Sequence, residues 1–244
     1  MSRAAVSAAG DSKRAPTDDV LPTGEAKRAA VKSMFDTIAP RYDLVNRLMT
    51  FRMDVGWRRR TVDALGLTPG SLVADIACGT GDLCRDLECA QMRPIGIDLS
   101  YGMLASARTQ APLLQGDALS LPIRTASVTG LTCGFALRNF VDLAPFFIEA
   151  ARVMRRGGRI ALLEVASPPN PVLAWGHGIY FGKVVPQIGA LLSDRAAYRY
   201  LPKSVSYLPP VEDMLDTLRS AGFTHVERTL LSTGIAQLIT ATRA

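Results

Sequence analysis

The stretch from Val73 to Asp82 constrains the fold of this chain more than any other part of the sequence. An apolar segment ends at Asp75, the turn Gly79-Thr80-Gly81 follows, and Asp82 begins a predicted helix; a second apolar segment then ends at Asp98. Strand, glycine turn, helix, strand and acid in this order are typical of a βαβ unit that binds a nucleotide. Glycine lets the backbone approach a ligand closely, and a terminal acid can accept hydrogen bonds from both ribose hydroxyls. The sequence therefore predicts a site for an adenosine-containing cofactor.

The charges around the glycine turn favour one class of cofactor. A dinucleotide fold prefers a third glycine in its G-x-G-x-x-G motif, where this chain has Cys84. Asp82 at the helix N-terminus, with Asp75 just before the turn, would repel a phosphate but suit a cation. S-adenosylmethionine carries a sulfonium and an ammonium group and no phosphate, so it fits these charges better. The alternative is an ordinary α/β turn whose acid only caps the helix.

Length and composition limit the class of protein. A chain of 244 residues with 48% hydrophobic residues is long enough for one large α/β domain. Its four cysteines form no CxxC pair, which is typical of a reducing, cytoplasmic compartment. No stretch reaches the roughly 20 apolar residues of a membrane span, and the first residues lack the apolar core of a signal peptide. The two isolated histidines, His177 and His225, predict no metal site.

The net charge of +6 is concentrated near the N-terminus. Between Arg41 and Arg60 six arginines face two acids, so this segment alone carries +4 (six minus two). Such a cluster is compatible with a nucleic acid, an anionic membrane surface or a solvated helix face.

The chain divides into a tail and one domain. Residues 1–23 are polar and aperiodic and are expected to be a disordered tail, and 24–244 form a single domain with an N-terminal helical lid at 24–66 and a helical insertion at 171–208. Alternating strands and helices predict a mostly parallel sheet with helices on both faces, and the short turn at 232–234 predicts an antiparallel last strand. The expected helices are 25–38, 41–50, 54–65, 82–90, 100–109, 142–155 and 210–221, and the expected strands are 71–76, 93–98, 112–115, 128–134, 158–166, 223–231 and 234–242. Arg156-Gly157-Gly158 is expected to stop the helix at 142–155 and to form a turn.

Several motifs, taken in order over roughly residues 30 to 240, resemble the ubiquinone/menaquinone-biosynthesis C-methyltransferase family. The resemblance implies a class I methyltransferase fold of the Rossmann-like type, with a seven-stranded, mostly parallel sheet whose last strand is antiparallel. The motifs are Met34-Phe35-Asp36-x-Ile38-Ala39-x-Arg41-Tyr42-Asp43-x-x-Asn46, the loop Asp75–Asp82, Gly116-Asp117-Ala118, Phe135-Ala136-Leu137-Arg138-Asn139-Phe140, Leu163-Glu164-x-x-x-Pro168 and Ala197-Tyr198-Arg199-Tyr200-Leu201-Pro202-x-Ser204.

The resemblance and the glycine loop together imply a site for S-adenosylmethionine. Asp98 matches the acid that binds the ribose, and Asp117 with Ala118 matches the pair beside the adenine. The alternative is that Asp117 caps a turn and Ala118 only provides spacing. Gly134 matches a position where relatives can carry serine, so a backbone contact is expected there. The predicted cofactor residues are Asp75, Gly79, Thr80, Gly81, Asp98, Asp117, Ala118 and Gly134.

The implied reaction is methylation of a ring carbon of a prenylated hydroquinone, with demethylmenaquinol preferred. A ubiquinone precursor or a soluble small metabolite is the alternative substrate. A phenol has a pKa near ~10 in water, so the ring needs a cationic stabiliser or a base. Arg138 is predicted to stabilise a phenolate and Asn139 to donate to a quinol oxygen, while Glu164 and Asp43 are candidate proton acceptors. The alternative for Arg138 is a surface ion pair.

A prenyl chain keeps such a substrate in the bilayer. Residues 171–192, with Trp175 and Tyr180, are therefore expected either to contact the membrane from the cytoplasmic side or to pack as a lid. No Asn-Pro-Pro-Tyr motif follows the fourth predicted strand, so no nucleic-acid partner is expected. A homodimer is left open.

Overall fold

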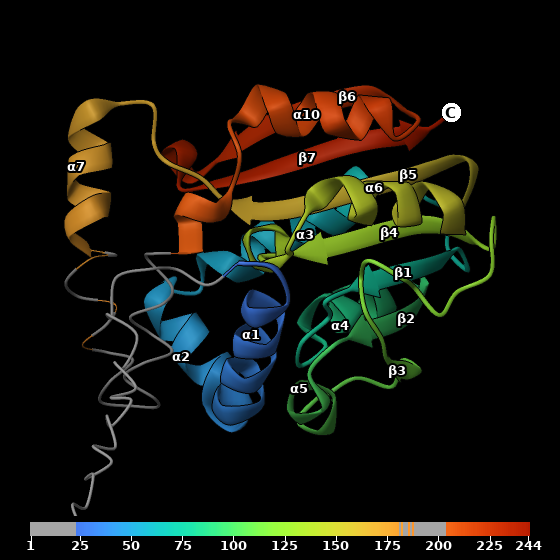
Figure 1. Ribbon diagram of the computed structural model, residues 1–244, viewed down its shortest axis with the longest axis horizontal. Coiled ribbons are helices and arrows are strands. Elements are labelled where there is room, and N and C mark those ends of the chain that lie inside the picture. Colours follow the sequence, from blue (N-terminus) through green and yellow to red (C-terminus); the bar gives the residue numbers. More distant parts are fainter. Residues whose placement is uncertain (1–22, 181, 183–184, 186, 188–203) are drawn as a thin grey trace, which may run out of the picture.

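A seven-stranded sheet runs through the middle of the computed structural model, which describes residues 23–180, 182, 185, 187 and 204–244 (Figure 1). In these residues the strand order is β3-β2-β1-β4-β5-β7-β6. Neighbours from β3 to β5 pair in parallel, and β7 pairs antiparallel with both β5 and β6, as predicted. The strands are β1 (Leu72–Ile76), β2 (Arg93–Asp98), β3 (Leu113–Gln115), β4 (Val128–Gly134), β5 (Met154–Val165), β6 (Phe223–Leu231) and β7 (Ala236–Arg243).

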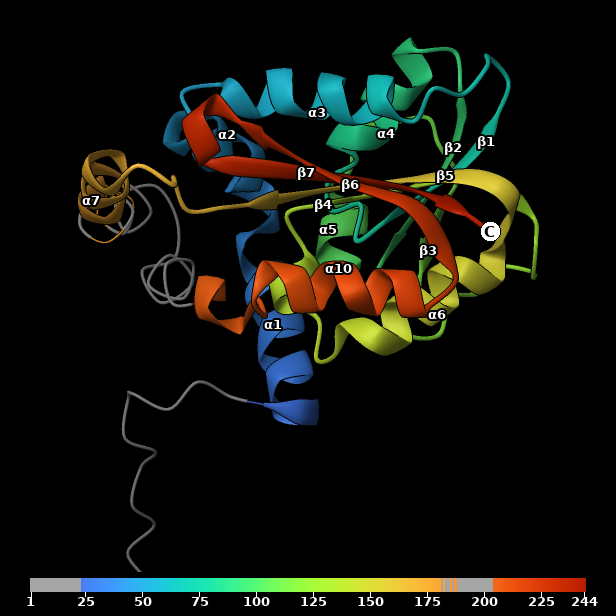
Figure 2. The ribbon, with the colours of Figure 1, turned by 90° about the horizontal axis from the view of Figure 1, so that it is seen from above.

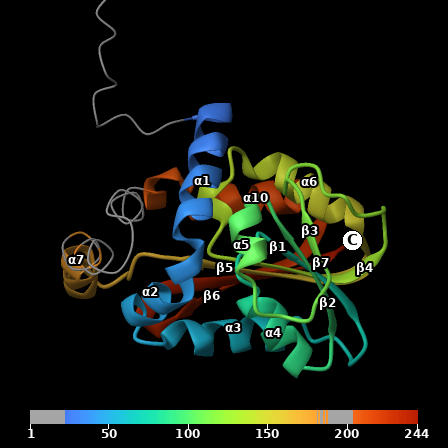
Figure 3. The ribbon, with the colours of Figure 1, turned by 90° about the horizontal axis from the view of Figure 1, so that it is seen from below.

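Helices cover both faces of this sheet (Figures 2 and 3). On one face α3 and α4 pack against each other and on the central strands, and on the other face α6 and α10 form a second layer. Central strands covered on both sides must be apolar throughout, which explains why four of the five residues of β1 are buried. The helices are α1 (Gly24–Ile38), α2 (Tyr42–Met49), α3 (Met53–Ala64), α4 (Asp82–Cys89), α5 (Tyr101–Ala105), α6 (Leu143–Val153), α7 (Pro171–Ile179) and α10 (Val211–Ser220).

The N-terminal helices divide into two groups by position. In Figure 1, α1, α2 and α7 lie beyond the ends to which β4 and β5 point, whereas α3 packs along the sheet. The carboxyl ends of the parallel strands are therefore covered by α1 and α2, which come from the segment 24–66.

Most element boundaries lie within two residues of those predicted from the sequence, and the largest differences are at the start of β5 and the end of α5. The helix expected at 142–155 ends at Val153, and β5 begins at Met154. The register jumps from Val128↔Met154 to Gly130↔Arg159, so the Arg-Gly-Gly segment forms a bulge in β5 and not a helix stop. Gly157 allows the bulge because it adopts a φ of +76°. The helix expected at 100–109 ends at Ala105.

Part of the predicted organisation lies outside the described residues. This holds for nearly all of the expected tail and for much of the insertion at 171–208, including motif residues 197–203. Within the segments that are described, no helix has both the length and the apolar character needed to cross a membrane.

A buried arginine joins α3 to the helix that follows the glycine loop. Arg58 is 7% exposed and contacts Asp54 on its own helix. It also bonds Asp86 at 2.9 Å and Asp82 at 3.2 Å, both on α4. Such a guanidinium is tolerated in the interior because several carboxylates surround it. This cluster fixes the start of α4 relative to α3.

We expect Arg58→Ala to lower the free energy of unfolding by about 3–5 kcal/mol, because it leaves buried carboxylates without their partner. The exposed neighbour provides a matched control, since Arg59→Ala should change stability by no more than about 0.5 kcal/mol. Urea denaturation measures both. Equal effects of the two substitutions would contradict a structural role for the buried cluster.

Candidate active site

Two cavities open at the carboxyl edge of the parallel strands. In open α/β sheets ligands bind at this edge, where the strand order reverses, and here the reversal lies between β1 and β4. The small cavity has a volume of about 100 Å³ and the large cavity about 380 Å³. Both include Phe35, Tyr42, Phe135 and Asn139 in their walls. A group bound in one cavity therefore lies next to a group bound in the other.

The small cavity brings together most of the residues predicted to bind a cofactor. Five of them line it from the carboxyl ends of four strands or the loops that follow, although they are up to 55 positions apart in the chain (134 minus 79). They are Gly79, Asp98, Asp117, Ala118 and Gly134.

Asp98 is held for hydrogen bonding at the end of β2. Its Oδ2 accepts the backbone N–H of Gly79 and its Oδ1 accepts that of Ser100, each at 2.8 Å. Each carboxylate oxygen has a further lone pair, so both can still accept a hydroxyl. Burial raises the pKa of Asp98. This geometry fits the predicted binding of a diol such as a ribose.

The glycine loop needs its glycines for conformation and for space. Gly79 and Gly81 adopt φ values of +54° and +82°, in the left-handed region. A Cβ on Gly81 would lie 2.8 Å from Cγ2 of Thr109. At Gly134 a Cβ would lie 2.8 Å from Cδ1 of Leu83, so a side chain here requires that leucine to move.

The acids of the first strand and the following helix do not face the small cavity. Asp75 is fully buried, accepts a hydrogen bond from Thr132 at 2.8 Å and contacts the Cys84 thiol at 3.4 Å. Burial raises its pKa to about 7. Asp82 is paired with Arg58, Arg47 and Arg85. Among the described residues, the acids that line the small cavity are Asp98 and Asp117. The acids whose charges favoured a cationic cofactor in the sequence, Asp75 and Asp82, do not line it.

The predicted contact residue Thr80 meets the predicted proton acceptor Asp43. The Thr80 hydroxyl donates to Asp43 Oδ1, which joins the glycine loop to α2. Both residues line a third, open cavity of about 410 Å³ together with Arg47 and Arg108. Thr80 and Asp43 therefore line neither the small nor the large cavity.

Arg138 and Glu164 form a buried ion pair at the ends of β4 and β5. The Nη1 of Arg138 lies 2.5 Å from Glu164 Oε1, and the two side chains are 6% and 0% exposed. Glu164 also accepts the backbone N–H groups of Arg138 (3.2 Å) and Val165 (2.8 Å). The guanidinium and two backbone N–H groups thus hold the Glu164 carboxylate in place. Glu164 does not itself line the large cavity.

The remaining bonds of Arg138 fix its orientation toward the large cavity. Its Nη1 donates to the carbonyl of Phe135 at 2.6 Å and its Nε to the hydroxyl of Ser204 at 3.2 Å. Within the residues described, these contacts do not use Nη2. Arg138 and Asn139 both line the large cavity, and Asn139 also lines the small one. A guanidinium and an amide therefore lie close to the boundary between the cavities.

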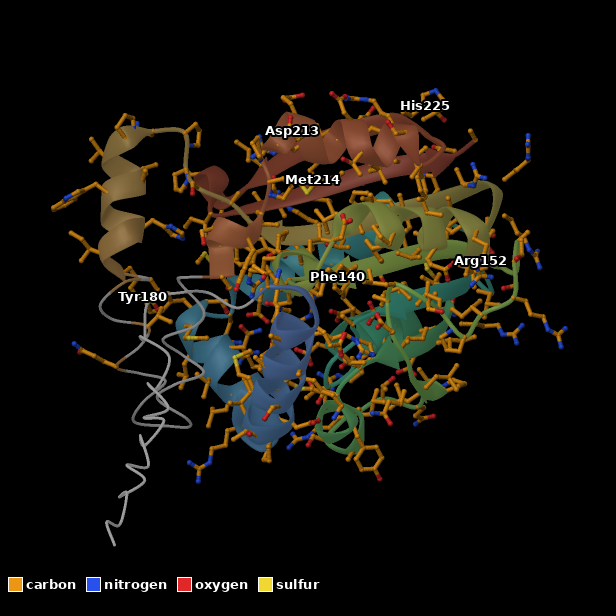
Figure 4. All side chains as sticks on the ribbon, in the orientation of Figure 1. Phe140, Arg152, Tyr180, Asp213, Met214 and His225 are labelled. Atoms are coloured by element: carbon orange, nitrogen blue, oxygen red, sulfur yellow. The ribbon has the colours of Figure 1, made fainter. Side chains whose placement is uncertain are left out.

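The walls of the large cavity are otherwise mostly apolar and aromatic. Trp57 packs against Phe135 with ring centroids 6.1 Å apart, and its Nε1 donates to Ser232 at 2.8 Å. Figure 4 labels Tyr180, whose ring lies 5.6 Å from that of Phe51. The sequence analysis assigned no function to Trp57 or Asn46, which both line this cavity. The position of Asn46 in the motif Arg41-Tyr42-Asp43-x-x-Asn46 was the signal available.

Metal ligands do not gather at this edge. Across residues 23–180 and 204–244, no three His, Cys, Asp or Glu side chains form a group that could hold a metal ion. The acids that line the small cavity are instead hydrogen-bonded to backbone amides or to arginine.

The sequence is similar to known methyltransferases over nearly all of its length. The model of the ubiE/COQ5 methyltransferase family matches residues 23–243. A demethylmenaquinone methyltransferase of Roseiflexus castenholzii is 40% identical over 233 residues, which cover 91% of this chain and 97% of that protein. The ubiquinone/menaquinone biosynthesis C-methyltransferase UbiE of Syntrophotalea carbinolica is 38% identical, covering 87% and 94% of the two chains.

Solved structures support the same fold. A SAM-dependent methyltransferase from Thermotoga maritima is 20% identical with a TM-score of 0.62, covering 87% of this chain and 99% of that one. Phosphoethanolamine N-methyltransferase 2 from Haemonchus contortus, solved with S-adenosyl-L-methionine, gives a TM-score of 0.56 at 13% identity. The match covers 76% of this chain and only 52% of the Haemonchus chain, so it spans about half of that enzyme.

The buried Asp75 predicts a specific pH dependence of stability. Because its pKa in the folded state is raised to about 7, its contribution to stability is greatest at low pH and is lost as the pH rises through 7. Asp75→Asn is neutral throughout, so we expect its stability relative to the parent protein to increase between about pH 5.5 and 8.5. Urea denaturation at both pH values measures this, with the exposed Asp63→Asn as control. Parallel pH profiles for the parent and Asp75→Asn proteins would disprove the assignment.

Proposed function

Because the chain belongs to the ubiE/COQ5 methyltransferase family, we propose that it transfers the methyl group of S-adenosylmethionine to a ring carbon of a prenylated hydroquinone. The substrate we assign is demethylmenaquinol, which would give menaquinol. One observation carries this proposal: a small cavity with Asp98 and Asp117 in its wall and a large, mostly apolar cavity share a wall of four residues at the switch point of the sheet. A cofactor and an apolar acceptor would meet there.

We assign the cofactor to the small cavity. Its donor set fits S-adenosylmethionine, since Asp98 can take the ribose hydroxyls and the Asp117–Ala118 pair lies further along the same cavity. Bound there, the cofactor supplies an electrophilic methyl group. Gly79 and Gly81 keep the loop close to the ligand, while Thr80 fixes the loop through Asp43. In this assignment Asp75 binds no cofactor but supports the glycine loop, because it accepts hydrogen bonds from Thr132 and Cys84.

We assign activation of the ring to Arg138. A guanidinium does not lose its proton in proteins, so Arg138 acts by stabilising the negative charge of a phenolate and not as a base. Such preorganised charge is strongest where water is excluded, and Arg138 is 5% exposed. Glu164 keeps the guanidinium in place. Asn139, which lines both cavities, is placed to donate to a quinol oxygen. Asp43 and Glu164 are the candidate acceptors for the phenolic proton, and since neither lines the small or the large cavity the transfer would run through water.

The cavity walls favour a prenylated ring over the alternatives. A soluble small metabolite would not need a mostly apolar cavity of about 380 Å³. A ubiquinone precursor stays the second candidate, because the relative from Syntrophotalea carries both quinones in its name. Incubation with labelled S-adenosylmethionine and each demethylated quinol, followed by mass spectrometry of the lipids, decides between them. Methylation of the benzoquinol alone would reassign the substrate.

We also propose that the protein works at the cytoplasmic surface of a membrane. Seven large apolar side chains are exposed on α2, the following turn and α7: Leu44, Leu48, Phe51, Val172, Leu173, Trp175 and Ile179. Several of them, with Tyr180, also line the large cavity, so the same surface forms its entrance. Exposed arginines flank α2 at positions 41 and 52 and suit anionic lipids. A homodimer that covers this surface is the alternative occupant.

Arg138→Ala should lower kcat by about 10²- to 10³-fold while changing the affinity for S-adenosylmethionine by less than about twofold. Removing one charge of a buried pair also destabilises the fold, so the double variant Arg138→Met/Glu164→Gln, which removes both charges, serves as the control. It should fold and remain as inactive as the single variant. Steady-state kinetics and calorimetry test this. Retained turnover, or an equal loss of cofactor binding, would refute the role of Arg138.

The double variant Phe51→Ser/Trp175→Ser should bind anionic liposomes at least about tenfold more weakly than the parent protein, since burying one large apolar side chain stabilises by about 1.5–3 kcal/mol. Tyr101→Ser/Ile148→Ser removes two equally exposed apolar side chains elsewhere and is the matched control. Vesicle sedimentation measures binding. If both double variants sediment like the parent, α2 and α7 do not contact the membrane. If the parent protein is a dimer that Phe51→Ser/Trp175→Ser dissociates, the surface is a subunit interface.

A further inference from the structure

Arg28 of α1 forms an ion pair in the wall of the small cavity. Its Nε lies 2.9 Å from Asp117 Oδ2, and both side chains belong to the cavity wall. Its Nη1 lies 2.9 Å from Oε1 of Glu25, which is three residues earlier on the same helix. Neither the sequence motifs nor the proposed chemistry assigned a function to Arg28.

The pair fixes the orientation of the Asp117 carboxylate. Within its own loop, Oδ1 accepts the backbone N–H of Leu119 at 2.9 Å. Arg28 holds the other oxygen, and it comes from a helix 89 positions away in the chain. Since a carboxylate oxygen has two lone pairs, Oδ2 can keep Arg28 and still accept one more hydrogen. The free acceptor direction of Asp117 is therefore set by Arg28.

The rest of α1 keeps Arg28 at this position. Residues Arg28, Val31, Lys32 and Phe35 line the cavity with the spacing of one helix face. At one end Lys27 donates to the Phe140 carbonyl at 2.6 Å and lies over the Tyr207 ring at 3.7 Å; Phe140 is labelled beside α1 in Figure 4.

Near the other end of the helix, Asp36 accepts the Ser100 hydroxyl at 2.6 Å and the Gly102 N–H at 2.9 Å. The helix is thus attached on both sides of the cavity wall that it forms.

We propose that Arg28 is a specificity-determining residue that makes this cavity select a purine with a 6-amino group. A carboxylate accepts hydrogen bonds and cannot donate them, so an oriented Asp117 binds an amino group and repels a 6-oxo group. The proposal rests on the assignment of the cofactor to the small cavity, with its adenine beside Asp117. Arg28 lies on α1, outside the motif Gly116-Asp117-Ala118, so the proposal adds a new residue to this part of the site.

The test compares S-adenosylhomocysteine and S-inosylhomocysteine, which differ in the 6-amino or 6-oxo group and in the proton that the 6-oxo ring carries on N1. The parent protein should prefer the adenosine compound by roughly tenfold. Arg28→Met keeps most of the side-chain volume but loses the charge. It should weaken binding of the adenosine compound about three- to tenfold and reduce the preference by a similar factor. In turnover, KM for S-adenosylmethionine should rise while kcat at saturation stays unchanged.

Two variants separate this role from a structural one. Glu25→Gln removes the other partner of Arg28 and should leave affinity and preference within about twofold of the parent. Arg28→Lys retains the charge and should restore part of the preference. Thermal unfolding checks that all variants fold.

The outcomes are distinct. Parent-like affinity and preference in Arg28→Met would overturn the proposal, and so would tighter binding, because it would mean that Arg28 competes with the cofactor. A parent protein that binds neither compound would instead refute the proposed function itself.

Discussion

Parallel pairing of β1 with both β2 and β4 is the constraint on which the site depends. With the parallel pairing of β5, it places the carboxyl ends of β1, β2, β4 and β5 at one edge of the sheet. Asp98 and Glu164 lie at the ends of β2 and β5, and the segments after β1 and β4 carry Gly79 and Arg138. Because the strand order reverses between β1 and β4, neighbouring loops leave toward opposite faces and a crevice opens. Both cavities occupy this crevice. The antiparallel β7 contributes to the same core but its chain direction carries it away from the edge.

Burial sets the electrostatics at this edge. The buried Arg58 and Arg138 and the half-buried Asp98 are each surrounded by groups of opposite charge or by backbone amides. A charge in the interior is tolerated only with such partners. The pairing of Arg138 with Glu164 therefore gives the guanidinium a counterion in the interior. A lone arginine at the same place would be a buried charge without a carboxylate beside it.

Much of the fold could be predicted from the sequence because its signals are local. Alternation of apolar segments with helices, and the short turn before the last strand, are properties of neighbouring residues, and the predicted sheet is confirmed. The bulge at Gly157 was missed because a glycine after a helix resembles a helix stop equally well. The sequence placed Asp98 and Asp117 among the cofactor residues, and both line the small cavity. That Asp82 does not face this cavity was not predictable, since it is paired with arginines that come from other helices. The same limit applies to Thr80 and Asp43, and to the face of α1 that closes the small cavity.

The wall shared by the two cavities has a thermodynamic consequence. Phe35 and Tyr42 line both cavities and belong to one continuous helical stretch, from α1 through the turn at 39–41 into α2. A ligand that orders this stretch from one side reduces the entropy lost when the second ligand binds from the other. By linkage any such gain in affinity is equal in both directions, so in the proposed arrangement donor and acceptor would help to retain each other, and the departure of one would loosen the hold on the other.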